Sequence, residues 1–248
     1  MNGRRIARLI GRALITIGIL GLLWGFVTWR WGDPVTSTYT RWKQHQLAHE
    51  YASIAPRFAL APKAAATSTH RVDREKAIRA AADRMRGSID DGQAIGRIVV
   101  PRLGLNMVLV NGTNAGALEK GPGRDPRSYL PGEGQLIYIA GHRTTFLAPF
   151  AHIDSLRPGD RVVLKMPYAI ATYRVAFHVI VPAADLARLK SHGREVVALQ
   201  ACHPRFSARD RYIVYAWPIS IVPVARGTSS TVAAAAGLPG SVGETQSR

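Results

Sequence analysis

Residues 196–216 read VVALQACHPRFSARDRYIVYA, and this stretch decides how the rest of the chain is interpreted. Two short runs rich in β-branched and aromatic residues, 196–201 and 211–216, flank a polar loop that contains proline. Such runs, bounded by turn residues, are typical of β-strands. The stretch therefore predicts two strands, with Cys202 at the end of the first and Arg211 at the start of the second. A hairpin-like return would put Arg211 beside Cys202 across the ladder.

Further short runs rich in β-branched residues precede this stretch, at 95–101, 106–110, 135–140, 161–166 and 171–180. Few helical patterns lie between them. Seven or eight short strands of this kind predict a mainly β domain, either a closed barrel or a sandwich. We expect this domain to span 91–223. The remaining residues, 224–248, are rich in Ala, Gly, Ser and Thr and predict a disordered tail.

The N-terminus has the pattern of a membrane anchor. Residues 1–12 contain four arginines and no acid, and 13–29 contain no charge. Trp24 and Trp29 are typical of a membrane interface, and the positive-inside rule places the N-terminus in the cytoplasm. We therefore predict a single-pass transmembrane signal anchor at 13–30 in the cell membrane, with the following domain extracytoplasmic. A cleaved signal peptide is the alternative, but no small-x-small cleavage site follows the apolar run.

Residues 31–90 are interpreted as an extracytoplasmic stalk or linker with helical content. Trp42, Leu47, Tyr51 and Ile54 suggest a short amphipathic helix within it. Residues 71–87 also look helical, with Val72, Ile78, Ala82 and Met85 near one face.

The chain is strongly basic, with 33 Lys and Arg against 16 Asp and Glu and a formal net charge of +17. The excess is spread along the sequence, which suits a protein held near anionic lipid headgroups or acidic wall polymers. Zinc-finger spacing and interleaved aromatic and basic residues are lacking, so nucleic acid is not an expected partner. The sequence contains no acidic cluster that would suggest calcium, and we expect no metal and no other cofactor.

Cys202 is the single cysteine of the chain, so it forms no internal disulfide and no Cys-based zinc site. The non-catalytic interpretation of Cys202 is a buried, inert side chain. As a nucleophile it needs a base, which an imidazole can supply, and a donor for the developing oxyanion, which a guanidinium can supply. His142 follows the run 135–140, and Gly141 before it permits a close backbone path. Cys202, His142 and Arg211 are therefore the candidate catalytic set.

Short motifs from 96 to 219 resemble those of sortases, most closely the class E sortases of actinobacteria. They cover about half of the chain and follow the order found in that family. They are RIVVPRLG (97–104), VNGT (110–113), GPG (121–123), PGEG (131–134), IAGHRTT (139–145), APF (148–150), LQACHP (199–204) and FSARDRYIV (206–214).

The resemblance implies an eight-stranded sortase-type β-barrel with short helices, preceded by one transmembrane helix. It implies a cysteine transpeptidase in which Cys202 is the nucleophile, His142 the acid/base and Arg211 the electrostatic partner. His203, Arg205 and Arg209 are the competing residues, and the family match favours the first set. Because adjacent side chains of a strand point to opposite faces, His203 would also point away from the side of Cys202.

The implied substrate is a secreted protein with a C-terminal sorting signal of the LPxTG or LAxTG type. The signal would be cleaved between Thr and Gly through a thioacyl intermediate. The protein would then pass to an amine of a peptidoglycan precursor or another acceptor, with wall anchoring expected rather than pilus assembly. The alternatives are a hydrolytic cysteine peptidase of the same fold and an inactive barrel that binds wall polymers.

One position departs from the family pattern. Ala201 stands where the family usually has threonine before the cysteine, so a hydroxyl is expected to be missing from the substrate pocket. Together with Ala201, we predict that Arg143 and Thr144, which follow His142, shape substrate binding.

Overall fold

The structure is a computed structural model of the 248-residue chain, and it describes residues 3–31, 34–62 and 71–226. The tail expected at 224–248 lies outside the described residues from 227 onward. Its first residues continue the fold, since the Val224 amide donates to the Tyr168 carbonyl at 2.8 Å. Residues 63–70 of the expected linker also lie outside the described residues.

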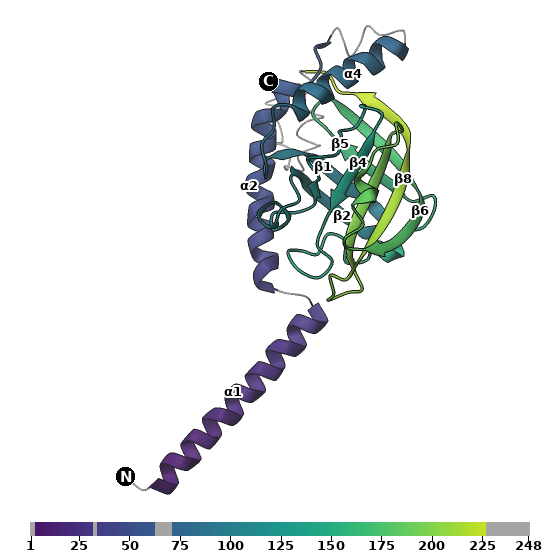
Figure 1. Cartoon of the computed structure of the whole chain (residues 1–248). Helices are drawn as coiled ribbons and strands as arrows, with labels where there is room; N and C mark the ends of the chain where they lie inside the picture. Colours follow the sequence, from purple (N-terminus) through teal and green to yellow (C-terminus); the bar gives the residue numbers. More distant parts are fainter. Residues whose placement is uncertain (1–2, 32–33, 63–70, 227–248) are drawn as a thin grey trace, which may run out of the picture.

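Eight strands form a closed barrel in the order β1-β2-β3-β4-β7-β8-β6-β5, which confirms the mainly β barrel expected from the sequence (Figure 1). Seven strands coincide with the apolar runs, and the eighth, β3, has two residues only. The strands are β1 (Ala94–Val100), β2 (Leu105–Asn111), β3 (Gly123–Arg124), β4 (Leu136–Ala140), β5 (Arg161–Lys165), β6 (Ala169–Pro182), β7 (Val196–His203) and β8 (Asp210–Pro223). Short helical elements between them are α5 (Ala115–Leu118), η1 (Pro101–Leu103), η2 (Ile153–Ser155) and η3 (Leu186–Leu189).

Strands β4, β7 and β8 are apolar on both faces, and this explains their near-continuous hydrophobic sequences. Their inward side chains, such as Val197 and Leu199, belong to the main core. On the outer face a second, smaller cluster combines Leu136, Tyr138, Val181, Ala198 and Ile213. This outer cluster gives part of the barrel's surface an apolar floor.

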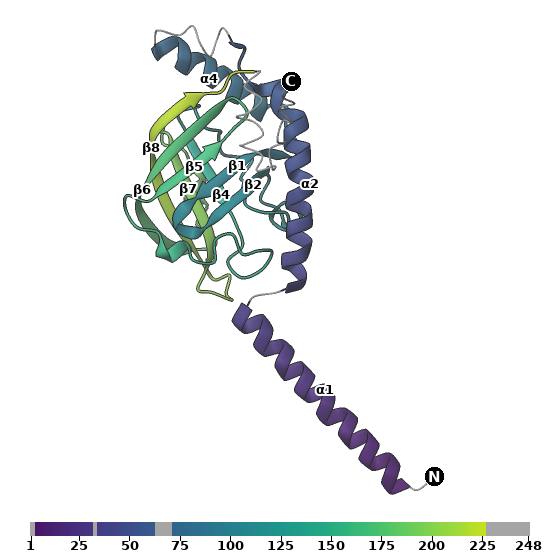
Figure 2. The same ribbon diagram turned by 180° about the vertical axis from the view of Figure 1, so that it is seen from behind.

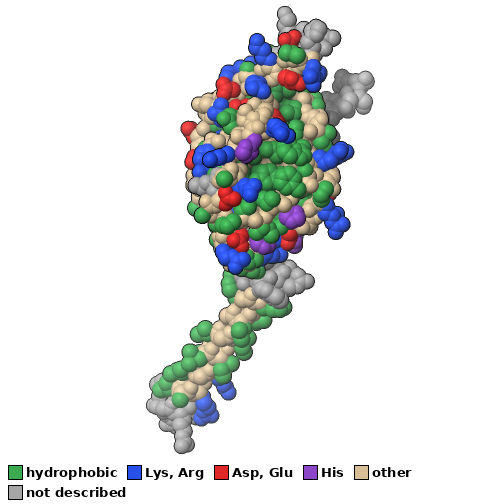
Figure 3. Space-filling model, turned by 45° about the vertical axis from the view of Figure 1, so that its right-hand side comes forward, with side chains coloured by type: hydrophobic (Ala, Val, Ile, Leu, Met, Phe, Trp, Pro, Cys, Tyr) green, Lys and Arg blue, Asp and Glu red, His purple; other side chains and the backbone are tan. Residues whose placement is uncertain are grey.

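Helix α1 (Gly3–Trp31) extends from the barrel as a separate rod (Figure 1). Its segment Ile6–Phe26 has 21 residues, a mean hydropathy of 1.9 and no burial within the protein. Hydrophobic side chains along the rod are visible in Figure 3. Its length and composition suit a membrane span, and a signal sequence has the same properties.

Helix α2 (Pro34–Phe58) lies against the barrel, as both ribbon views show (Figures 1 and 2). The Gln44 side chain accepts from the Val108 amide at 2.6 Å and donates to the Val108 carbonyl at 3.0 Å. It therefore provides a hydrogen-bond partner for both backbone groups of this β2 residue. A shared cluster buries residues of the helix and the barrel, namely Leu47, Ala48, Tyr51, Ala55, Ala94, Val108, Val110 and Ala117. The region expected as a stalk therefore contains a helix that is part of the domain. Trp42, expected on its apolar face, is 54% exposed.

Helix α4 (Arg71–Arg86) packs over one end of the barrel through Ile78, Ala81, Ala82 and Met85. These residues join the main core. The apolar face expected at 71–87 is thus confirmed at Ile78, Ala82 and Met85, whereas Val72, also expected on it, is 68% exposed.

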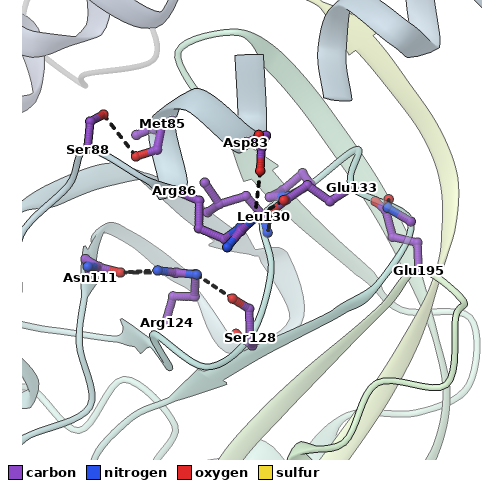
Figure 4. A network of polar contacts seen from close by, with 12 residues as sticks. Asp83, Met85, Arg86, Ser88, Asn111, Arg124, Ser128, Leu130, Glu133 and Glu195 are labelled. Atoms are coloured by element: carbon purple, nitrogen blue, oxygen red, sulfur yellow. Dashed lines mark hydrogen bonds and ion pairs between the residues drawn. The ribbon is translucent and has the colours of Figure 1, made fainter. Parts of the chain in front are cut away.

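A network of buried polar groups supports this end of the barrel (Figure 4). The Glu133 carboxylate accepts from Arg86 Nε at 2.9 Å and from the Leu130 amide at 2.6 Å. Arg124, only 1% exposed, donates to Asn111 Oδ1 at 3.1 Å and to the Ser128 carbonyl at 2.6 Å. Burial lowers the pKa of Arg124 to about 10.

Glu195 belongs to the same end of the molecule. It accepts from the amides of Gly132 and Gly134, each at 3.0 Å, and from the Tyr173 hydroxyl at 2.7 Å. Buried polar groups cost little when they are paired in this way.

Candidate active site

Parallel pairing of β4 and β7 brings His142 beside Cys202. The register matches Ala140 with Gln200, and the Gly141 amide continues the ladder by donating to the Gln200 carbonyl at 3.0 Å. Two residues beyond the matched pair, the two chains reach His142 and Cys202. Neighbouring strands lie about 4.8 Å apart, so these residues emerge next to each other at the same end of the sheet.

Antiparallel pairing of β7 and β8 puts Arg211 directly opposite Cys202, as the hairpin-like return predicted. The half-buried Arg211 is held at the edge of the loop, because its Nη1 donates to the carbonyls of Ala208 at 2.8 Å and Asp210 at 3.1 Å. The guanidinium is thus positioned by backbone oxygens of its own turn.

The three predicted residues line one cleft of about 260 Å³ on the outer face of the barrel. Among the residues that the structure describes, no hydrogen bond joins the thiol, the imidazole and the guanidinium, which is common in an active site without substrate. The apolar floor comes from the outer cluster. The cleft is lined by Thr113, Leu118, Asp125, Arg127, Tyr138, Ala140, Gly141, His142, Val181, Ala183, Asp185, Leu189, Gln200, Cys202, Arg211 and Ile213.

His142 is half-buried, with its ring centroid 5.0 Å from that of Phe146. Burial lowers the pKa of His142 below the ordinary histidine value, against an opposing effect of the Glu119 carboxylate. The ring therefore favours its neutral form, which can accept a proton. The preceding Gly141 is required by close packing, because an added Cβ would lie 2.7 Å from the Phe150 ring.

The loop after His142 has an unusual backbone. Phe146, Leu147 and Ala148 have φ values of 52°, 62° and 40°, a left-handed run that is strained for residues with side chains. The Phe146 amide donates to Thr36 Oγ1 at 3.1 Å, so the first turn of α2 holds this loop from outside the barrel.

Arg143 connects the two strand ends that carry His142 and Cys202. Its side chain is buried, and Nη1 donates to the Cys202 carbonyl at 3.3 Å and lies 3.0 Å from His203 Nδ1. Nη2 pairs with Asp154 at 2.7 Å. Arg143 was expected to bind substrate, but its contacts fasten the histidine loop to the nucleophile strand.

Two other residues expected to bind substrate also lie outside the set that lines the cleft. Ala201 has no exposure and packs in the interior of the barrel. A threonine hydroxyl at that position would therefore face the core. Thr144 is half-buried in the loop.

The competing residues have other surroundings. His203 stands opposite Asp210 in the ladder and approaches Arg143, whereas Arg205 and Arg209 are exposed in the loop. None of the three is among the described residues that line the cleft.

Sequence reasoning missed one polar pair in the cleft wall. The Asp125 carboxylate accepts from Arg127 Nη2 at 2.7 Å and from Thr113 Oγ1 at 3.3 Å. Burial alone would raise the pKa of Asp125, but these hydrogen bonds hold it below the ordinary value. The motif VNGT at 110–113 was the available signal in the sequence, because its last residue, Thr113, is the one that contacts Asp125.

Comparison with known proteins gives matches over this same region. The model of the sortase domain matches residues 98–219. Sortase D of Bacillus subtilis is 35% identical over 131 residues, which cover 51% of this chain and 64% of that protein. Sortase SrtE1 of Streptomyces coelicolor is 26% identical over 238 residues, which cover 89% of this chain and 59% of that protein. The chain thus spans less than two thirds of the length of either relative.

A solved structure has the same fold. The X-ray structure of Clostridium perfringens sortase C with the C-terminal cell wall sorting motif superposes with a TM-score of 0.52. Sequence identity is 22%, and the match covers 61% of this chain and 91% of that one. The expected likeness to class E has its counterpart in SrtE1, and the D-type relative has the higher identity. Residues 98–219, about half of the chain, are a sortase domain.

Proposed function

We propose that the chain is a transpeptidase in which Cys202, His142 and Arg211 act together on a peptide bond. The observation that carries this proposal is the convergence of three strand ends, of β4, β7 and β8, on one cleft. Each strand end supplies one of the three groups that thiol-based acyl transfer needs. The sequence relatives, both named sortases, support the same activity.

In the first half-reaction the Cys202 sulfur attacks the carbonyl carbon of the scissile bond. His142, favoured in its neutral form by burial, takes the thiol proton and later gives it to the leaving amine. Arg211 donates to the oxygen that becomes negative in the tetrahedral intermediate. Collapse of the intermediate breaks the C–N bond and leaves the acyl group on sulfur as a thioester.

In the second half-reaction an amine attacks the thioester. His142 takes the proton that the amine loses, a new peptide bond forms, and the thiol leaves with that proton. If water arrives before the amine, the product is a carboxylic acid and the enzyme acts as a hydrolase. The outcome depends on which nucleophile reaches the cleft first.

The substrate class we propose is a secreted protein with a C-terminal sorting signal of the LPxTG or LAxTG type, cleaved between Thr and Gly. The sortase C structure with a sorting motif supports this class for the fold. Tyr138, Val181, Leu189 and Ile213 give the cleft an apolar wall suited to the leading apolar residue of such a signal. The amine would come from a peptidoglycan precursor or another wall acceptor.

We also place the enzyme in the cell membrane. Helix α1 supports a single-pass anchor by its length and apolar composition, with the arginine-rich N-terminus cytoplasmic and the barrel outside. Protease added to spheroplasts tests this topology. A barrel outside the membrane should be digested, and a protected barrel would contradict the proposal.

Mass spectrometry of the full chain in detergent tests the chemistry. We expect a covalent adduct on Cys202 with signal peptides, and its loss in Cys202→Ala. The full chain is preferable to a fragment from about residue 70, because truncation there would remove α2 and expose the surface that it covers. Adding an amine should convert hydrolysed product into ligated product. An intact Cys202 that forms no adduct with any signal peptide would favour a wall-binding barrel.

A further inference from the structure

A second, larger groove lies on the outer face of the barrel beside the cleft. Its volume is about 590 Å³. We call it the aromatic groove and define it by an aromatic wall of Phe177, Tyr215 and Trp217 and a basic rim of Arg188, Lys190 and Arg194. The mechanism above uses none of these six residues.

The aromatic wall is exposed in a way that indicates binding. Phe177 and Tyr215 face each other across β6 and β8, with ring centroids 5.0 Å apart and an interplanar angle of 25°. Trp217 lies 6.5 Å from Phe177, and Phe177 and Trp217 are 46% and 40% exposed. Figure 3, which brings the side of β6 and β8 forward, shows hydrophobic side chains gathered on this face with basic ones beside them. Contiguous exposed apolar surface of this kind marks interaction sites.

The rim has an excess of positive charge. Arg188 pairs with Asp185 at 3.2 Å, and among the described residues that line the groove Asp185 is the one acid. Within the described part of the chain, no ion pair is formed by Lys190 or Arg194. The groove therefore complements a ligand that combines carboxylates with apolar or aromatic groups.

The groove and the catalytic cleft are continuous along three strands, β4, β7 and β8. On β8, Tyr215 lines the groove and Ile213 the cleft. On β4, Leu136 lines the groove and Tyr138 the cleft. On β7, Val196 lines the groove and Cys202 the cleft, and Asp185 lines both. At about 3.3 Å per residue, the six residues from Val196 to Cys202 span roughly 20 Å. The four residues of a sorting signal up to its threonine span only about 13 Å when extended.

The acyl part of the substrate must stay bound until the amine arrives, whereas the part beyond the scissile bond leaves. The retained part therefore needs the surface that extends from Cys202, and its upstream residues reach the aromatic groove. We propose that the groove binds the segment immediately before the sorting signal, with a preference for acidic side chains interspersed with apolar or aromatic ones. This inference rests on the proposed function and names a determinant of its substrate choice.

Paired peptides test the proposal with the full chain in detergent. One has the sorting signal alone, and three have it preceded by six residues that are acidic and aromatic, Gly/Ser only, or basic and aromatic. We expect the acidic extension to raise kcat/KM roughly tenfold over the Gly/Ser extension through KM, from a few weak ion pairs and one aromatic contact. Because exposed ion pairs are screened, added salt should reduce the advantage.

Variants assign the effect to the groove. Arg194→Glu with Lys190→Glu, and separately Trp217→Ala, should remove the advantage and leave the rate with the signal-only peptide unchanged. Arg161→Ala, an exposed arginine on β5, serves as the matched control and should keep the advantage. Equal rates for all extensions, or an advantage that survives in the variants, would overturn the proposal.

Direct binding separates this inference from the chemistry. Fluorescence anisotropy of the labelled extension peptides with the Cys202→Ala chain reports the groove even if no turnover occurs. Tighter binding of the acidic peptide, lost in the groove variants, supports the proposal whatever the fate of the transpeptidase assignment. Groove variants that lose affinity for an anionic wall glycan, but bind all peptides alike, would show that the groove serves the polymer.

Discussion

At the α4 end of the barrel the buried charges have two or more partners each. At the cleft, in contrast, the three reactive side chains are half-buried, and no hydrogen bond joins them in the described part of the chain. Glu133 and Arg124 are each fixed by a guanidinium or amide and a backbone group. His142, Cys202 and Arg211 are instead held through their backbones by strand register. The contrast teaches that the polar groups at one end stabilise the fold, while those at the other remain available to a substrate.

The largest expected effect is at the cleft. His142→Ala should lower kcat/KM by about 10²–10⁴-fold, because it removes the imidazole that is proposed to move the proton between thiol and leaving amine. The melting temperature should change little, since the ring is only half-buried. Steady-state kinetics and thermal melting of the same preparation check this. His152→Ala, at an exposed histidine, should behave like the unaltered chain, and an active His142→Ala variant would refute the assignment.

Arg143 shares features of both regions. It is buried like the residues of the network at the α4 end, but it contacts the strand of the nucleophile. Arg143→Ala should lower kcat by roughly 10²-fold, because a small displacement of reacting groups has an effect of that size. Asp154→Asn removes only its charged partner and should have a smaller effect. Measuring kcat and KM separately, alongside melting, distinguishes positioning from folding. A variant that melts earlier but turns over normally would assign Arg143 to stability alone.

At the α4 end, Glu133→Ala should lower the free energy of unfolding by about 1–3 kcal/mol, because the buried Leu130 amide loses its acceptor. Turnover below the melting temperature should be unchanged. Chemical denaturation measures the first quantity and steady-state kinetics the second. The matched control is Glu75→Ala on α4, whose exposed pair with Arg71 is 3.7 Å long and should contribute little. Equal stability of the two variants would contradict the contrast between the ends.

The smallest expected effect concerns pH. Burial lowers the pKa of His142, so the acid limb of kcat/KM should lie below the ordinary histidine value near 6.5. The folded chain binds this proton less readily than the unfolded chain. The corresponding contribution to stability is therefore present at neutral pH and is lost as the pH falls through the folded pKa. A profile of kcat/KM against pH measures the apparent pKa of this acid limb.

Glu119→Gln sharpens this test. Removing the carboxylate that opposes the shift should move the acid limb further toward low pH, whereas Glu75→Gln should leave it in place. A limb above the ordinary histidine value, or one that moves upward in Glu119→Gln, would contradict the burial argument.

The strand-like runs predicted most of the barrel and the pairing of Arg211 with Cys202, whereas His142 was chosen from the family resemblance. Seven apolar runs became strands. The loop at 204–209 places Arg211 opposite Cys202, because an antiparallel ladder pairs residues symmetrically about its loop. Strand β3 was not predictable, since two polar residues carry no periodicity. Helix α2 was taken for a stalk because its contacts use small or polar side chains such as Ala48, Ala55 and Gln44, which give a weak hydrophobic pattern.

The roles of individual side chains were harder to predict than the elements. Arg143 follows His142 in sequence, and its partners, the Cys202 carbonyl and Asp154, are identified only by tertiary structure. The inward direction of Ala201 depends on which face of β7 turns toward the core. The alternation that was applied to His203 in the sequence also places Ala201 on the face opposite Cys202, but the expectation for Ala201 came from the family pattern and did not take it into account.

The contact between Thr36 and the Phe146 amide has a geometric consequence. Thr36 follows the last residue of α1, Trp31, by five positions, and five residues reach at most about 18 Å. If α1 crosses the bilayer, the histidine loop is tethered within that reach of the lipid surface. A client protein would then be intercepted as it emerges from the membrane, before the rest of its chain has diffused into the wall.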